Sequence, residues 1–361
     1  MMSPKQISDD RGSPHFRRTP FQIIHVIGNF CRIWSVYSMY RYLNQTGAPV
    51  VLFLFCCLVP SSIIFLILHQ PWKGRALSNQ QIVPSLINGV ITALYFILWG
   101  KGLKSCGPLR AILSEYSGAV LGVLSGVLYG RRGHVWKKVG GLIAMLLALF
   151  FLSQGWATSS LSPFYILLCN TDIKEEEVLT AQALGLMGMM IPVFAGILSA
   201  LRRVIARRVS LKNQQKKRLH AITITSATCF LFPLAMWDLV IGSSSGKTVE
   251  LPFSAWAFLS TIVFGIILIF YVDNIAEERL HMVFSSPRHL MVAGACIIVM
   301  EIAYEMDFSL PGFIVCCLVL GFGIFEATSL ERSKKDSSIK SEDLSNGVLG
   351  NDFDTSPILP I

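Results

Sequence analysis

The chain has 361 residues, of which 53% are hydrophobic and 15% are charged, and its mean hydropathy is +0.56. A soluble domain of this length does not need so many apolar residues for its core, so the composition excludes an ordinary soluble protein and predicts a polytopic membrane protein. The formal net charge is +9. We attribute this charge to basic loops on one side of a membrane and not to nucleic-acid binding, so nucleic acid is not an expected partner.

Residues 1–20 are polar and lack an apolar stretch, so we expect a cytosolic N-terminal segment and no cleaved signal peptide. Ten apolar stretches follow, each long enough to cross the ~30 Å hydrocarbon layer of a bilayer as a helix. They cover residues 21–43, 48–69, 81–101, 107–129, 138–155, 180–202, 219–241, 253–274, 286–304 and 310–327. The polar tail 329–361 is rich in Ser and Asp and predicts a disordered cytosolic tail or linker.

The distribution of basic residues predicts the orientation of this all-α protein. Of the 31 Lys and Arg residues, 24 fall in the two terminal segments and in or directly beside the even-numbered connections, and eight of these lie in the cluster 202–218. Cytosolic loops hold most Lys and Arg residues, so both termini are expected in the cytosol. We also expect the cluster 202–218 to touch anionic lipid headgroups.

Two stretches indicate internal symmetry. Span four begins GPLRAIL and is followed by the glycine-rich VGGLIAMLLALFF, whereas span nine begins SSPRHLM and is followed by PGFIVCCLVLGFGIF. The chain is therefore predicted to contain two five-helix repeats, residues 21–155 and 180–328, joined by a lumenal loop at 156–179. Because five is odd, the second repeat is inverted relative to the first, as in alternating-access carriers.

Several ionisable residues fall inside the predicted spans. A charge in the bilayer costs about 2.5 to 3.5 kcal/mol on insertion scales, so such residues usually pair or face a cavity. Arg110 and Glu115 are about 140° apart around a helix and form no good local pair, so we expect Arg32 to be the partner of Glu115. Two interpretations stay open, a water-accessible cavity lined by both halves and buried structural pairs. The candidates are Arg32, Glu115, Asp238, Asp273 and Glu301.

A second group of ionisable residues lies at the end of span eight. Asp273, Glu277 and His281 are spaced i, i+4, i+8 and share one helical face, which is a candidate site for a divalent cation. A solvated helix end is the alternative. No Walker loop, GxSxG or HExxH motif is present, so the sequence predicts no enzyme and no tightly bound cofactor.

Two short runs carry a resemblance to known transporters. They are LKSCGPLRAIL, with Cys106, Gly107, Pro108, Leu109 and Arg110, and IFYVDNI, with Phe270, Tyr271, Val272 and Asp273. These runs resemble the N-terminal membrane region of secretory-pathway zinc transporters of the cation diffusion facilitator family, the zinc transporter five type. The ten-helix arrangement also resembles the drug/metabolite transporter superfamily.

The resemblance implies a role in zinc transport into the early secretory pathway. It implies a Golgi or early secretory membrane, zinc as the transported ion, and a cation diffusion facilitator partner in a heteromer, with this chain as a non-catalytic module or truncated form. The HxxxD zinc-binding pairs of the transporting domain are not found among the seven His residues. The alternative function is a carrier of the drug/metabolite type for a small metabolite such as a nucleotide sugar.

Overall fold

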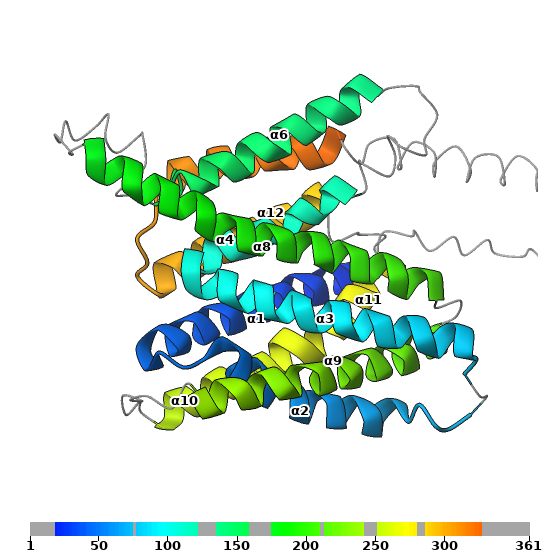
Figure 1. Cartoon of the computed structure of the whole chain (residues 1–361). Coiled ribbons are helices and arrows are strands. Elements are labelled where there is room, and N and C mark those ends of the chain that lie inside the picture. The colour runs from blue at the N-terminus through cyan, green and yellow to red at the C-terminus, as the bar shows by residue number, and fades with distance from the viewer. Residues whose placement is uncertain are drawn as a thin grey trace, which may run out of the picture.

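The structure is a computed structural model that describes residues 19–74, 77–121, 135–158, 175–209, 213–241, 251–279 and 286–326. These residues form helices and turns, with no strand among them, which confirms the predicted all-α class. The helices run side by side in a bundle (Figure 1). Of the predicted N-terminal segment 1–20, residues 1–18 lie outside the described residues, as does the whole predicted tail 329–361, whereas residues 19 and 20 already belong to the first helix.

The helices of the first half follow the predicted spans closely. They are α1 (Thr19–Thr46), α2 (Val50–His69), α3 (Asn79–Cys106), α4 (Pro108–Ser114), the 3-10 helix η1 (Glu115–Gly118) and α6 (Val135–Ser153).

The second half begins at Glu175. It consists of α8 (Glu175–Val209), α9 (Asn213–Ile241), α10 (Leu251–Ser260), the π-helix η2 (Thr261–Leu268), α11 (Ile269–Arg279), α12 (Pro287–Ala303) and the apolar helix Leu310–Glu326.

Six of the described segments are long and apolar enough to cross a membrane. They are Val50–His69, Asn79–Cys106, Trp136–Ser153, Leu186–Ala206, Lys216–Val240 and Phe253–Glu277. These segments expose large apolar side chains such as Ile67, Ile87 and Leu239, which a bilayer would cover. The chain is therefore a multipass helical membrane protein. The number of ten spans stays a prediction.

Two predicted spans are not uniform α-helices. The stretch predicted at 107–129 changes from α4 to the 3-10 helix η1 at Glu115, and the stretch at 253–274 contains η2 between α10 and α11. Hydropathy predicts that a stretch is helical and apolar, but it does not distinguish i+3, i+4 and i+5 hydrogen bonding. In addition, α8 begins at Glu175, inside the segment 156–179 that was predicted as a lumenal loop.

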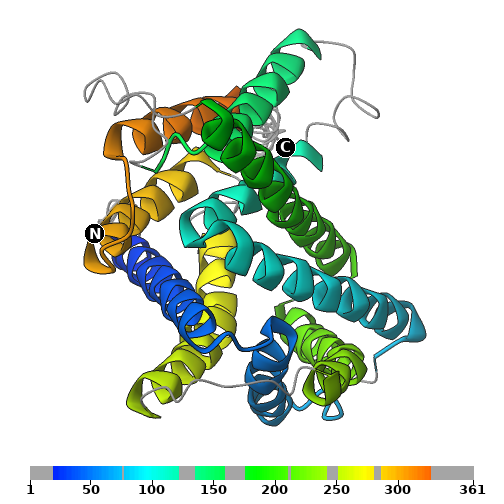
Figure 2. The ribbon, with the colours of Figure 1, turned by 60° about the vertical axis from the view of Figure 1, so that its left-hand side comes forward.

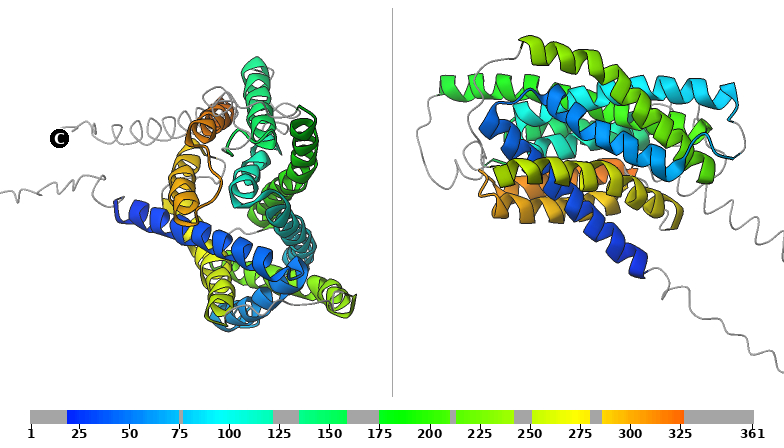
Figure 3. Two further views of the ribbon diagram at one scale, coloured as in Figure 1. Left: turned by 90° about the vertical axis from the view of Figure 1, so that its left-hand side faces the viewer. Right: turned by 90° about the horizontal axis from the view of Figure 1, so that it is seen from below.

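The helix α1 lies in the middle of the bundle. It contacts α3 and α4 of the first half and α10, η2, α11 and α12 of the second half. Figure 2 and the left view of Figure 3 show α1, in dark blue, crossing between the yellow and orange helices of the second half. Helix α8 in turn contacts α3, α4 and η1. Helices from both halves thus share one interior.

The two ends of the bundle are named here by the ends of α1. At the Thr19 end, Tyr271 hydroxyl and His69 Nε2 lie 3.1 Å apart and join α11 to α2. At the Thr46 end, Lys104 Nζ at the end of α3 donates to the Gly47 and Ala48 carbonyls, 3.3 Å each. These contacts define two opposite faces to which a cavity can open.

Candidate functional site

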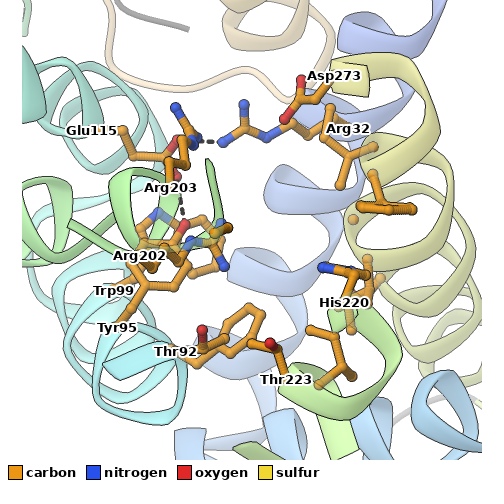
Figure 4. Close-up of a pocket in the computed structure, with 18 of the residues that line it drawn as sticks. Arg32, Thr92, Tyr95, Trp99, Glu115, Arg202, Arg203, His220, Thr223 and Asp273 are labelled. Atoms are coloured by element: carbon orange, nitrogen blue, oxygen red, sulfur yellow. Dashed lines mark hydrogen bonds and ion pairs between the residues drawn. The ribbon is translucent and has the colours of Figure 1, made fainter. Parts of the chain in front are cut away.

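A cavity of ≈ 220 Å³ lies between the two halves of the bundle. Residues of α1, α2, α3 and η1 line it from the first half, and residues of α8, α9, η2 and α11 line it from the second. Its lining residues on α8, α9 and α11 include Ala206, Lys216 and Glu277, which lie close to the Thr19 end. The lining also includes Met39 and Leu54, which lie farther toward the Thr46 end, so the cavity extends from the Thr19 end past the middle of the bundle. Figure 4 shows lining residues of both halves around it, such as Glu115 and His220.

Aromatic side chains fill the bundle toward the Thr46 end. Phe53 of α2 and Phe258 of α10 have ring centroids 4.5 Å apart, and Tyr42 of α1 packs against both. Trp34 of α1 and Trp256 of α10 lie 5.0 Å apart. Rings from both halves thus pack against one another in the interior toward the Thr46 end.

An ion pair lies deep in the cavity. Arg32 of α1 binds Glu115 of η1, and the Tyr95 hydroxyl of α3 donates to the other carboxylate oxygen of Glu115 at 3.2 Å. The Glu115 side chain is 1% exposed, so these donors offset the cost of its buried charge. Figure 4 shows Asp273 of α11 beside Arg32, on the side away from Glu115.

Arg202 of α8 is the cation in the cavity that is best placed to bind a ligand. Its guanidinium lies 4.4 Å from the centre of the Tyr95 ring, and no ion pair joins it to a described residue. The cavity also holds Arg203 and Lys216. With Arg32 and Arg202, the lining has four cationic side chains. It has three carboxylates, those of Glu115, Asp273 and Glu277, so positive charge is in excess.

Lys216 and Glu277 form the edge of the cavity. Lys216 Nζ of α9 lies 3.0 Å from Glu277 Oε2 of α11, and the two side chains are 22% and 34% exposed. Arg32 and Glu115 are exposed only 13% and 1%. The lining is therefore more exposed at the pair Lys216–Glu277 than at the pair Arg32–Glu115.

Several buried polar atoms of the lining have no hydrogen-bond partner in the described part of the chain. They are Asn88 Oδ1, Trp99 Nε1, His220 Nε2 and Asn274 Oδ1. Asn88 is only 5% exposed and Trp99 only 8%. Buried polar groups are nearly always hydrogen-bonded, so these atoms fit a cavity that is filled by water or by a ligand with donors and acceptors.

The structure separates the ionisable residues predicted from the sequence. Arg32, Glu115 and Asp273 line the cavity. Asp238 is half-buried on α9 and is not part of the lining, and Arg110 is half-buried at the start of α4. Glu301 is buried on α12, away from the cavity, and accepts a hydrogen bond from Tyr37.

The predicted cation site is divided. Asp273 and Glu277 both line the cavity, but Glu277 binds Lys216, and His281 lies outside the described residues. Among the described residues, no group of three or more His, Cys, Asp or Glu side chains is arranged to hold a metal ion. This part of the chain supplies no complete zinc site of that composition.

Sequence reasoning missed Arg202, Arg203 and Lys216 as cavity residues. All three belong to the basic cluster 202–218, which was assigned to a cytosolic loop near lipid headgroups. Both helices extend farther than predicted, α8 to Val209 and α9 from Asn213, and they carry these side chains into the bundle. The signal available in the sequence was the position of Arg202 and Arg203 directly at the end of an apolar span.

The residues that carry the family resemblance occupy constrained positions. Gly107 has φ +83° between α3 and α4, which favours glycine, and Pro108 is the first residue of α4. Phe270 stacks on His220 of α9, with ring centroids 3.8 Å apart and planes at 8°. Phe270 and Asp273 both line the cavity.

Comparison with known proteins adds little to this picture. No family model matches the chain. A solved structure described only as "Crystal structure of protein" is 17% identical to this chain, covers 86% of this chain and 98% of its own, and superposes with a TM-score of 0.49. A likeness of this size carries no argument about function.

Proposed function

We propose that this chain is a carrier that binds a small organic anion in the cavity between its two halves and moves it across the bilayer. The observation that carries the proposal is Arg202, a cation in the cavity that forms no ion pair with a described residue. The partnerless polar atoms of Asn88 and Trp99 supply a hydrogen-bond acceptor and a donor for the same ligand. A phosphorylated metabolite such as a nucleotide sugar has this chemistry.

The helix contacts support two inverted five-helix repeats. In the predicted pairing, α1 corresponds to α8, α3 corresponds to the run from α10 to α11, and α4 with η1 corresponds to α12. Exchanging the halves converts the contacts of α1 with α10, η2, α11 and α12 into the contacts of α8 with α3, α4 and η1, all of which are present. Two structurally similar halves of this kind can expose a central site alternately to either side.

The position of the cavity fits one of the two states of such a carrier. The lining of the cavity reaches Lys216 and Glu277 near the Thr19 end, whereas aromatic rings pack together toward the Thr46 end. The distribution of Lys and Arg residues assigns the Thr19 end to the cytosol. We therefore interpret this conformation as open toward the cytosol.

A second candidate function rests on the family resemblance. The runs CGPLR and FYVD lie at the turn between α3 and α4 and on the cavity wall, where substitutions are constrained. In this alternative the chain is a non-catalytic module that supports zinc transport into the early secretory pathway beside a cation diffusion facilitator partner. The absence of a three-ligand His, Cys, Asp or Glu group in the described part of the chain is compatible with a supporting role.

Transport by the purified chain in liposomes tests the first proposal against the second. The probes are radiolabelled uridine monophosphate, UDP-glucose and citrate, with a zinc-sensitive dye inside a parallel set of liposomes. The carrier proposal predicts saturable uptake of at least one anion and no uptake of zinc. Saturable zinc uptake without a partner, or uptake of none of the three anions, would contradict it.

Two variants identify the site in the same assay. Arg202→Gln removes the cation in the cavity and should abolish the anion uptake. Arg208→Gln is the matched control, because Arg208 is also on α8 but is exposed and does not line the cavity. Equal loss in both variants would show that the effect is not local to the cavity.

A further inference from the structure

A buried carboxylic acid joins α1 to α12 outside the cavity. Glu301 of α12 is 3% exposed and Tyr37 of α1 is 1% exposed. The Tyr37 hydroxyl donates to Glu301 Oε1 at 2.5 Å. Neither residue lines the cavity, so the pair has no role in the binding site described above.

The groups that face Glu301 do not neutralise a negative charge. The titratable groups near it are the hydroxyls of Tyr37 and Tyr40 on α1 and the carboxylate of Asp307, which follows α12. No described Lys or Arg forms an ion pair with Glu301. The nearby cation Arg41 lies over the Tyr304 ring instead, 5.9 Å from its centre.

This environment suits the protonated acid better than the carboxylate. An ionised group taken out of water without a counter-ion is costly, whereas a neutral acid needs only hydrogen bonds. The neutral acid keeps its Oε1 as an acceptor for Tyr37. Loss of the proton would leave a buried charge that has the Tyr37 hydroxyl as a hydrogen-bond donor but no counter-ion among the described residues. Admitting water, or separating α1 from α12, would lower the cost of that charge.

The same part of α1 holds the Thr46 end of the bundle together. Ser38 Oγ lies 2.9 Å from the Tyr304 hydroxyl and accepts a hydrogen bond from Trp256 Nε1 of α10 at 3.2 Å. The rings of Tyr37 and Tyr304 are 5.5 Å apart. Two consecutive residues of α1 thus bind both α10 and the end of α12, across the boundary between the two halves.

We propose that Glu301 and Tyr37 form a proton-binding site that holds the Thr46 end closed while Glu301 is protonated and lets it open when the proton leaves. In this step the O–H bond of Glu301 breaks, its electron pair stays on the carboxylate, and the proton passes to water at the Thr46 end. The proposed proton site is inferred from the burial of Glu301 and its hydrogen bond with Tyr37. Coupling of proton release to solute movement rests in addition on the proposed carrier function.

Infrared difference spectroscopy of the full chain in lipid nanodiscs, without added ligand, tests the proton site. A pH titration should show the carbonyl stretch of a protonated carboxylic acid that disappears as the pH rises. Glu301→Gln should remove this band, and Tyr37→Phe should shift it because the hydrogen bond to Oε1 is lost. Asp238→Asn is the control and should leave the band in place, because Asp238 lies on α9 and belongs neither to this pair nor to the lining of the cavity.

Persistence of the band in Glu301→Gln would overturn the proposal, as would an unshifted band in Tyr37→Phe. Hydrogen exchange of the same sample provides the structural readout. After correction for the intrinsic pH dependence, exchange at the ends of α1 and α12 should be faster in the deprotonated state, and this difference should be absent in Glu301→Gln. Since no ligand is present, a positive result here together with failed anion uptake would reject the carrier function and retain the proton site.

Discussion

Arg32 of α1 and Glu115 of η1 form an ion pair inside the cavity, although 83 residues separate them in the chain. The Tyr95 hydroxyl of α3 donates a hydrogen bond to the same carboxylate, so a third helix joins the pair. The pair therefore holds three elements of the first half in fixed positions around the cavity. In the proposed carrier, it also places a charged group on the path of the solute.

The first prediction concerns the stability of this pair. Glu115→Gln should lower the free energy of unfolding by about 3 to 5 kcal/mol, because it leaves Arg32 beside a neutral amide in a buried place. A double variant that also carries Arg32→Gln should recover part of this loss, because the two residues are in contact. Thermal melts in detergent measure both effects.

Asp238→Asn is the control for this experiment. Asp238 is half-buried on α9 and makes none of the ion pairs described, so its neutralisation should change the melting temperature little. Additive effects of the two substitutions at Arg32 and Glu115 would rule out the coupling between them.

The second prediction concerns the packing of α8 on η1. A Cβ atom at Gly196 would lie 2.5 Å from the Ser114 carbonyl oxygen and 3.1 Å from Glu115 Cα. Gly196→Ala should therefore destabilise the protein by about 1 to 3 kcal/mol and displace Glu115.

Gly140 of α6 provides the matched substitution, since a Cβ atom there meets nothing within 4 Å. Gly140→Ala should be neutral or stabilising by up to about 1 kcal/mol, because alanine favours the helix. The same melting temperature for both variants would mean that α8 does not approach η1 as closely as the structure shows.

The third prediction concerns the pair at the edge of the cavity. Glu277→Gln should change the free energy of unfolding by less than about 1 kcal/mol, because partly exposed ion pairs contribute little. The pair Lys216–Glu277 has exposed fractions of 22% and 34%, in contrast to Arg32–Glu115. Chemical denaturation in low and high salt measures this contribution, and a loss as large as that of Glu115→Gln would show that the cavity is closed at Lys216.

The fourth prediction concerns orientation. The distribution of Lys and Arg residues places both termini in the cytosol, with an even number of spans between them. In cells, epitope tags at the two termini should both be accessible to protease only after the plasma membrane is permeabilised. In sealed, cytosol-side-out vesicles, both tags should be accessible to protease from outside. Protection of one tag in those vesicles would exclude an even number of spans.

The sequence was informative about the helices and about one contact. Hydropathy located the helical stretches, because crossing a bilayer requires about 20 apolar residues. The rarity of charges inside them pointed to Arg32 and Glu115 as partners, and the structure brings these two together. Hydropathy did not predict the changes of helix type at Glu115 and Thr261. Nor does a local pattern contain the contact beside the first of them, in which the Ser117 hydroxyl donates to the Val193 carbonyl of α8.

The cavity cations were harder to predict. Arg202 and Lys216 belong to a basic run whose simplest interpretation is a cytosolic loop. The helices α8 and α9 extend into this run, to Val209 and from Asn213, and Arg202 and Lys216 line the cavity from these helices. Likewise, Glu301 was a candidate for either a cavity residue or a buried pair. In the structure it accepts a hydrogen bond from Tyr37 of α1, and neither residue lines the cavity.

The central claim is that the cavity binds organic anions through Arg202, and ligand-dependent thermal stabilisation of the purified protein tests it most directly. The probes are matched pairs that differ in charge: uridine monophosphate and uridine, glucose 6-phosphate and glucose, benzoate and benzamide. We predict that at least one anion raises the melting temperature, that its neutral counterpart does not, and that Arg202→Gln weakens the apparent affinity by about tenfold or more while Arg208→Gln does not. Equal stabilisation by charged and neutral members, or an effect that survives in Arg202→Gln, would contradict the account.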